Sequence, residues 1–205
     1  GFTDAAGYHK DKPVFDSDIT EKYEIITGTV LTQNTSWNNV YKCINALKEK
    51  KIVTPEIFLN TESDFIKALI KKSGYYNQKY TKLSKLLHFL ILNDYLNRPE
   101  SISRDALLEQ WGIGEETADS ILLYAFNKPY FVIDSYTRRL LKRIGNVFYK
   151  KYSEYQKYII NSIPKNIQIY NEYHALIVKH SVDVCRKKPL CSQCFLADRC
   201  EGRDI

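Results

Sequence analysis

The helical spacing of apolar residues constrains the fold of this chain more than any other feature. One expected helix carries five large apolar side chains on a single face: Trp37, Val40, Tyr41, Ile44 and Leu47. Similar stripes run through 83–90, 136–144 and 167–178. No stretch combines the alternating pattern of strands with hairpin turns. We therefore expect an all-α protein of about ten short helices.

Composition agrees with a folded globular chain. The 205 residues are 44% hydrophobic and 26% charged, which excludes disordered, collagen-like and low-complexity classes. No apolar run reaches the roughly 18 residues of a membrane span. Residues 1–12 lack the apolar stretch of a secretory signal peptide. We expect a cytoplasmic protein that makes no contact with a membrane.

Four of the five cysteines lie within the last 21 residues: Cys185, Cys191, Cys194 and Cys200. Disulfide frameworks suit small secreted domains without large cores, so this spacing favours a metal site. Structural zinc usually takes two close ligand pairs, and here only Cys191 and Cys194 form one. Four thiolates from one compact loop suit an iron–sulfur cluster, which we favour over zinc. Cys43, within an apolar helical pattern, is expected to be a core thiol.

The turn Gly112-Ile113-Gly114 separates two expected helices, 103–110 and 115–126, and Ser103 is the expected N-cap of the first. Two glycines one residue apart allow a tight hairpin whose backbone N–H groups face outward. Such amides at the start of a helix can bind a phosphate. A turn that merely joins two antiparallel helices fits the same pattern.

An extended apolar run over 129–133 ends in Asp134, ahead of the next helical stripe. Aspartate is a favoured N-cap, so this residue fits a purely structural role. A carboxylate that follows a phosphate-binding hairpin can also stabilise a cationic transition state or activate water. The residues alone do not separate these two roles.

Taken together and in this order, these features resemble the helix–hairpin–helix (HhH-GPD) DNA glycosylase superfamily, in its endonuclease III-related branch with an iron–sulfur cluster. The resemblance runs from about Tyr23 to Cys200. The runs GTVLTQNTSWNNV and VIDSYTRRLLKRIG are most similar to the 3-methyladenine DNA glycosylase-like subgroup. The resemblance implies two helical lobes around a DNA-binding cleft. A six-helix-barrel lobe would span 28–128, and a second lobe would combine 1–27 with 129–205, including the cluster loop 185–200.

The resemblance also implies roles for single residues. Asp134 corresponds to the catalytic aspartate, and Gly112 and Gly114 to the hairpin that grips the phosphate beside the lesion. Gln33 corresponds to a glutamine that fills the space left by a flipped base. Tyr75 stands where an apolar plug enters the duplex. The four clustered cysteines correspond to the ligands of a [4Fe-4S] cluster, with structural zinc as the alternative.

Two positions depart from the family pattern. Bifunctional members carry a lysine two residues after the last hairpin glycine, and this amine attacks the sugar. Glu116 occupies that position here, and glutamate cannot form a Schiff base, so we expect no lyase activity. The first cysteine gap has five residues where the family usually has six.

Basic residues and histidines accompany the cysteines. Arg186, Lys187 and Lys188 lie in the first cysteine gap, and we expect this loop to contact the DNA backbone. The net charge of +6 agrees with DNA binding but does not establish it. His174 and His180 are expected to make structural hydrogen bonds, because four thiolates already complete the ligand set.

The resemblance implies a monofunctional DNA glycosylase of base excision repair. It would act as a monomer on double-stranded DNA and flip out a damaged or mismatched base. We expect an alkylated purine such as 3-methyladenine. Two alternatives stay open at this point: a mismatch thymine or uracil DNA glycosylase on the same scaffold, and a non-catalytic DNA-binding module.

Overall fold

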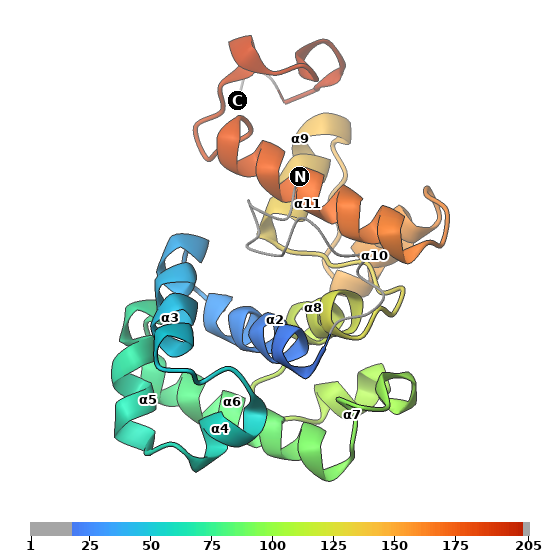
Figure 1. Ribbon diagram of the computed structural model, residues 1–205. Helices are drawn as coiled ribbons and strands as arrows, with labels where there is room; N and C mark the ends of the chain where they lie inside the picture. The colour runs from blue at the N-terminus through green and yellow to red at the C-terminus, as the bar shows by residue number, and fades with distance from the viewer. Residues whose placement is uncertain (1–17, 203–205) are drawn as a thin grey trace. The chain divides into compact units, whose positions relative to one another are not determined.

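The structure, a computed structural model, describes residues 18–202 (Figure 1). Within this range ten α-helices, α2 to α11, are joined by short 3-10 and π-helical turns, and there is no β-strand. The predicted all-α class is therefore confirmed. No helix in the described range is long and apolar enough to cross a membrane. The described residues divide after Lys128 into two compact units.

The first unit contains seven of these helices among its described residues. They are α2 (Ile19–Thr32), α3 (Trp37–Glu49), α4 (Pro55–Asn60), α5 (Ser63–Ile70), α6 (Tyr76–Leu92), α7 (Arg104–Leu108) and α8 (Glu115–Ser120). Three short turns complete it: η2 (Lys71–Ser73), η3 (Pro99–Ser101) and the π-helical η4 (Ile121–Ala125). The expected second helix of the hairpin, 115–126, is thus α8 followed by η4.

The boundary predicted at Gly28 differs from what the structure shows. Residues 1–27 were assigned to the other lobe, but α2 runs unbroken from Ile19 to Thr32 and belongs to the first unit. Its buried side chains, from Tyr23 to Leu31, lie on both sides of Gly28, so one packed helix face holds the segment together. Residues 1–17 lie outside the described residues.

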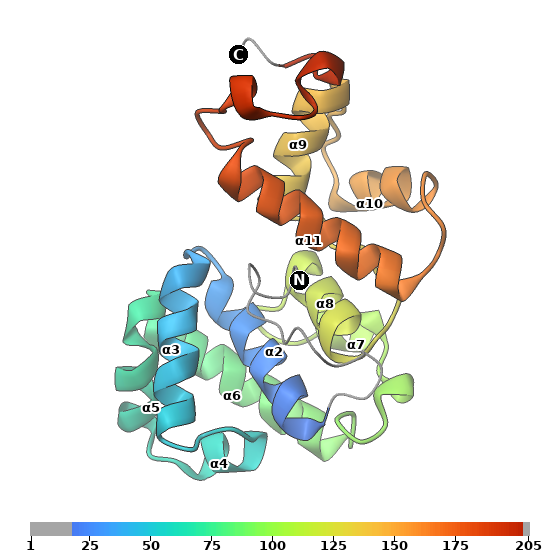
Figure 2. The ribbon, with the colours of Figure 1, turned by 45° about the horizontal axis from the view of Figure 1, so that its top comes forward.

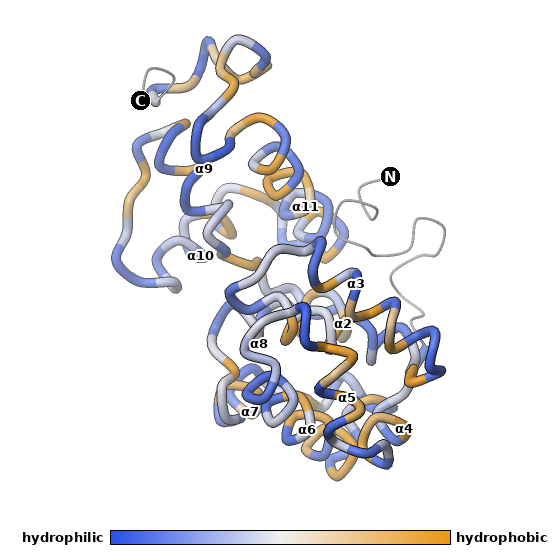
Figure 3. The backbone as a smooth tube through the Cα atoms, turned by 90° about the vertical axis from the view of Figure 1, so that its left-hand side faces the viewer, coloured by the Kyte–Doolittle hydropathy of each residue, from blue (hydrophilic) through white to orange (hydrophobic). Residues whose placement is uncertain are grey.

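The core of the first unit follows the predicted apolar stripes, except that Tyr41 of the α3 stripe is 51% exposed. α3 packs against α2 and α5, and α6 packs against α2, α4 and α5, as Figures 1 and 2 show. Hydrophobic and hydrophilic stretches alternate along these helices at the helical period (Figure 3). The side chains of Val40, Leu86 and Leu90 are fully buried, and so is that of Cys43, as predicted.

Short polar side chains start several of these helices. Asp18, Thr54 and Ser103 accept hydrogen bonds from backbone amides in the first turns of α2, α4 and α7, at 2.9, 3.4 and 3.1 Å. These caps satisfy N–H groups that the helix itself leaves without partners. The N-cap role predicted for Ser103 is confirmed.

The second unit contains α9 (Ser135–Gly145), α10 (Tyr152–Ile160) and α11 (Ile167–Asp183), followed by the cysteine loop with η5 (Cys191–Gln193) and η6 (Ala197–Arg199). α9 packs against α11 (Figure 2). The apolar segment 129–134 enters this unit in extended form, with the side chains of Phe131 and Ile133 fully buried. Side chains of α10 form hydrogen bonds with the backbone of this segment: Gln156 Nε2 donates to Phe131 O at 2.8 Å, and Tyr152 Oη accepts from Ile133 N at 3.1 Å.

Candidate functional site

The glycine turn of the first unit is a true hairpin between α7 and α8. Gly112 has φ +79°, a conformation that favours glycine, and a Cβ there would overlap the side chain of Lys82. Gly114 is the N-cap of α8, with φ −95° and open space where a Cβ would point. Ile113 is buried between them, while both glycines are exposed. The apolar residue anchors the turn and leaves its backbone accessible.

Gln33 is hydrogen-bonded to this hairpin. Its Nε2 donates to Gly112 O at 3.2 Å and to Thr117 Oγ1 at 3.0 Å. Its Oε1 accepts from Lys82 Nζ at 2.7 Å. Gln33 therefore joins three segments that are distant in sequence: its own, that of Lys82, and the hairpin with Gly112 and Thr117. The structure brings together the two elements that the resemblance assigns to DNA contact.

Tyr75 stands out on the surface of the same unit. Its side chain is 71% exposed, and its backbone has φ 46° and ψ 32°, a left-handed conformation that is uncommon for a bulky residue. Gly74 before it has φ 69°. A strained residue that presents an aromatic ring to solvent needs surrounding structure to hold it, and such residues cluster at binding sites.

Asp134 caps a helix and also lies close to a histidine. It is the N-cap of α9, where Oδ1 accepts from Thr137 N at 2.7 Å. Its Oδ2 lies 3.6 Å from His174 Nε2 on α11, and the side chain is only 13% exposed. Burial acts to raise the pKa of Asp134. Hydrogen bonds and charge from His174, with hydrogen bonds from Thr137, outweigh burial and lower that pKa below its ordinary value.

Glu116 lies in the first turn of α8 and is exposed. A carboxylate therefore occupies the position where the resemblance expects a lyase lysine. An amine does lie near the hairpin, because Lys82 reaches Gln33 from α6. That amine comes from a different helix and points to the glutamine.

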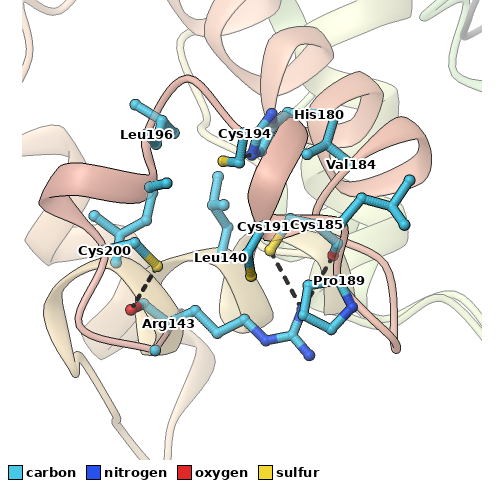
Figure 4. A pocket seen from close by; sticks show the side chains of 14 residues that line it. Leu140, Arg143, His180, Val184, Cys185, Pro189, Cys191, Cys194, Leu196 and Cys200 are labelled. Atoms are coloured by element: carbon cyan, nitrogen blue, oxygen red, sulfur yellow. Dashed lines mark hydrogen bonds between the residues drawn. The ribbon is translucent and has the colours of Figure 1, made fainter. Parts of the chain in front are cut away.

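The four clustered cysteines line one open hollow (Figure 4). All of them are free thiols in the described part of the chain. Arg143 Nη1 lies 3.3 Å from Cys185 Sγ, and the Cys200 thiol donates to Arg143 O at 3.3 Å. Cys194 Sγ lies 3.6 Å from His180 Nε2. Among the described residues no three His, Cys, Asp or Glu side chains converge closely enough to ligate a metal ion.

Arg143 also shapes the basic loop. Its guanidinium donates to Arg186 O at 2.6 Å and to Lys187 O at 3.0 Å. The side chains of Arg186, Lys187 and Lys188 are exposed. Gly202 closes the loop on the same helix: its N donates to Arg143 O at 2.8 Å, and a Cβ there would crowd the backbone of Arg143. Arg143, in the last turn of α9, thus binds the cysteine loop near its start, at Arg186 and Lys187, and near its end, at Gly202.

Comparison with known proteins identifies the family. The sequence model of the HhH-GPD superfamily of base excision DNA repair proteins matches residues 27–165. This chain belongs to that superfamily. A protein of Methanocaldococcus jannaschii that is named as a DNA repair glycosylase, MJ1434, is 43% identical over 188 residues, which cover 87% of this chain and 85% of the relative. The predicted resemblance is confirmed, and the chain is a DNA glycosylase of the HhH-GPD superfamily.

Solved structures of the superfamily share its fold. The 3-methyladenine DNA glycosylase MagIII of Helicobacter pylori, bound to 1,N6-ethenoadenine, matches with a TM-score of 0.70 and 30% identity over 84% of this chain and 90% of its own. A trapped covalent intermediate of endonuclease III with DNA matches with a TM-score of 0.77 and 23% identity over 98% and 92% of the two chains. At 23% identity, this second match establishes a shared fold and nothing about activity.

Three residues of these sites were not predicted to act there: His174, Lys82 and Arg143. His174 was expected only to make structural hydrogen bonds, but it faces Asp134 from a position 40 residues later. Lys82 and Arg143 fall in ordinary helical patterns, where a basic residue on a solvated face is the common case. Only the packing of the helices reveals their partners.

Proposed function

We propose that this chain is a monofunctional DNA glycosylase that flips a damaged base out of duplex DNA and releases it by hydrolysis. The base we assign is an alkylated purine such as 3-methyladenine. The observation that carries the proposal is a largely buried Asp134 whose carboxylate lies 3.6 Å from His174 Nε2. Such a carboxylate can stabilise charge and orient water. Position 116 is a glutamate, which has no amine to attack the sugar.

Asp134 supplies the chemistry. Departure of the base leaves positive charge on the sugar, and a carboxylate that stays ionised at neutral pH opposes that charge. His174 and the amide of Thr137 keep it ionised although it is largely buried. The same carboxylate can orient the attacking water and accept its proton. The water oxygen bonds to the sugar carbon, and the base leaves with the electron pair of the broken bond. No covalent bond to the protein is needed.

The hairpin, Gln33 and Tyr75 would perform the flipping step. The exposed backbone amides of Gly112 and Gly114 would bind a backbone phosphate, whereas the amide of Ile113 donates to Gln110 O within the turn. Gln33, hydrogen-bonded to that hairpin, fills the space vacated by the base, and Tyr75 wedges the opposite strand. Unstacking one base costs roughly a few kcal/mol, and it costs less when the base pair is damaged. The exposed loop of Arg186, Lys187 and Lys188 adds contacts to the DNA backbone.

One chemical argument and one comparison support an alkylated purine. In DNA, 3-methyladenine already carries positive charge, so it leaves readily once the sugar cation is stabilised. A relative of known structure that is 30% identical over most of the chain is a 3-methyladenine DNA glycosylase bound to an ethenoadenine. The proposal brings that substrate class to this chain.

We further propose that Cys185, Cys191, Cys194 and Cys200 hold a [4Fe-4S] cluster. The residues fit this group: four free thiols line one hollow, and because each iron of the cluster takes one thiolate, the four sulfurs need not converge on a single ion. The guanidinium of Arg143 lies 3.3 Å from Cys185 Sγ. When bound, the cluster supplies a rigid scaffold for the basic loop. Purified protein should be brown with about four irons per chain, whereas colourless, zinc-loaded protein would favour the alternative.

The experiment that tests the substrate is a panel of duplexes under single-turnover conditions. The panel holds 3-methyladenine, hypoxanthine, 1,N6-ethenoadenine, uracil and thymine mismatches, and 8-oxoguanine. Fast release of 3-methyladenine supports the proposal. Preferential release of mismatched thymine or uracil would replace it with the mismatch glycosylase, and tight binding without release of any base would indicate a non-catalytic DNA-binding module.

A further inference from the structure

Lys79 is a buried lysine in the first unit that the proposed chemistry does not use. It lies on α6 and is only 2% exposed. Its Nζ donates to Leu31 O at 2.8 Å and to Ser73 O at 2.6 Å. Both partners are backbone carbonyls, and both are themselves buried residues. One ammonium group therefore ties two chain segments, 48 and 6 residues away along the sequence.

Each of the two carbonyls lies two residues before a side chain that is proposed to insert into the DNA duplex. Leu31 precedes Gln33 by two residues, and Ser73 precedes Tyr75 by two residues. Leu31 is in the last turn of α2, where carbonyl groups lack partners within the helix, and a cation is favourable there. Ser73 ends the turn η2, directly before the two residues with positive φ, Gly74 and Tyr75.

The environment of Lys79 makes this burial unfavourable unless the hydrogen bonds compensate. Burial lowers the pKa of Lys79 to about 8; the nearby thiol of Cys43 acts in the opposite direction, and the charge of Lys82 adds to the lowering. A methionine of similar length would avoid that penalty. What the lysine adds is a fixed distance between two carbonyls.

We propose that Lys79 is a positioning residue, which holds the Gln33 and Tyr75 loops at a fixed separation so that both enter the duplex together. The inference rests on the proposed function, in which these two side chains insert into DNA. Tyr75 needs such support because its left-handed backbone relaxes when its anchor is lost. Gln33 keeps its bonds to Lys82 and the hairpin, so loss of Lys79 releases one loop relative to the other.

The first test needs no DNA. Lys79→Met removes the donors at similar volume, and Lys67→Met removes a half-buried lysine that pairs with Asp64 on α5. In the full chain, backbone amides of 31–35 and of 73–77 should exchange hydrogen faster in Lys79→Met and at the wild-type rate in Lys67→Met. Unchanged exchange in both segments would overturn the link. If Lys79→Met does not fold, Lys79→Gln, which keeps a donor on a shorter side chain, is measured instead.

The second test reads insertion without catalysis. The duplex carries an uncleavable tetrahydrofuran abasic analogue opposite 2-aminopurine, whose fluorescence rises when it unstacks. Wild type and Lys67→Met should give the same rise, and Lys79→Met should bind about tenfold more weakly with a smaller rise, because two charge-assisted hydrogen bonds are lost. The effect should be less than additive with Gln33→Ala and with Tyr75→Ala, as expected for one unit.

The outcomes separate the two claims. If Lys79→Met gives the same rise in 2-aminopurine fluorescence as wild type, the positioning role is overturned and the proposed function stands. Full additivity with both loop variants has the same consequence, because it shows that Lys79 does not act through them. No rise with wild type overturns the insertion step of the proposed function, and the positioning role falls with it.

Discussion

The carboxylate of Asp134 lies 3.6 Å from the imidazole of His174, which reaches it from α11. The pair joins the start of α9, at Ser135, to α11, which begins 32 residues later at Ile167. It gives a largely buried aspartate a partner that favours its charged form. The catalytic role proposed for Asp134 depends on this environment, which distinguishes it from a helix cap alone.

His174→Gln should move the acid limb of the pH–rate profile to higher pH. The substitution removes the charge and hydrogen bond that lower the pKa of Asp134, so burial, which raises that pKa, prevails. Because the folded pKa in wild type is below the unfolded value, the carboxylate stabilises the fold above about pH 4, and this contribution is lost as pH falls through the folded pKa. Base release measured across the acid pH range should therefore begin to fall at a higher pH in the variant than in wild type. A profile identical to wild type would show that His174 does not control Asp134.

Asp134→Asn should reduce base release by roughly a hundred- to ten-thousand-fold. Asparagine caps a helix about as well as aspartate, so the free energy of unfolding should change by less than about 1 kcal/mol. Asp18→Asn is the matched control, since Asp18 caps α2 through the same kind of bond to the third amide. Wild-type rates in Asp134→Asn, in single-turnover assays, would leave Asp134 with the capping role alone.

Gly112→Ala should destabilise the first unit, whereas Gly114→Ala should not. Gly112 has φ +79° and lies against Lys82, so alanine there is strained and displaces that side chain. The loss should be about 1–3 kcal/mol in denaturant titrations. Gly114 has an ordinary φ and open space around it, so its substitution should stay within about 0.5 kcal/mol. Equal losses at both positions would contradict the hairpin geometry.

Glu116→Lys should create a Schiff base with the sugar that borohydride can trap. The position lies in the exposed first turn of α8, where a lysine amine can reach an abasic sugar held by the hairpin. Glu115→Lys, one residue earlier, is the control and should give no trapped product. Failure of Glu116→Lys to trap, in a variant that still releases base, would mean that position 116 does not face the sugar.

Local features of this molecule were predictable because they depend on near neighbours in sequence. The helical stripe of α3, the cap at Ser103 and the burial of Cys43 follow from spacing and residue type. The division at Gly28 was not predicted correctly, because the sequence carries no mark of which unit a continuous helix joins. The π-helical end of the hairpin, η4, likewise has no sequence signal.

The site was predictable in its residue types and not in its contacts. Asp134, Gln33 and the glycine hairpin could be named from the sequence and the family resemblance. Their partners could not, because Lys82 is 49 residues from Gln33, and His174 and Lys79 meet their partners only when helices pack. Those partners determine the charge of Asp134 and the placement of Gln33, so function depends on contacts that local patterns do not contain.

One reaction tests the central claim most directly. Wild-type protein is incubated with a duplex that carries a single 3-methyladenine, and released base and strand integrity are followed in the same samples, with and without borohydride. The hydrolytic account predicts release of the base, an intact strand until alkali is added, and no trapped protein–DNA adduct. Strand cleavage without alkali, or an adduct in wild type, would contradict it, and Lys82→Met would then show whether the amine beside Gln33 is the nucleophile.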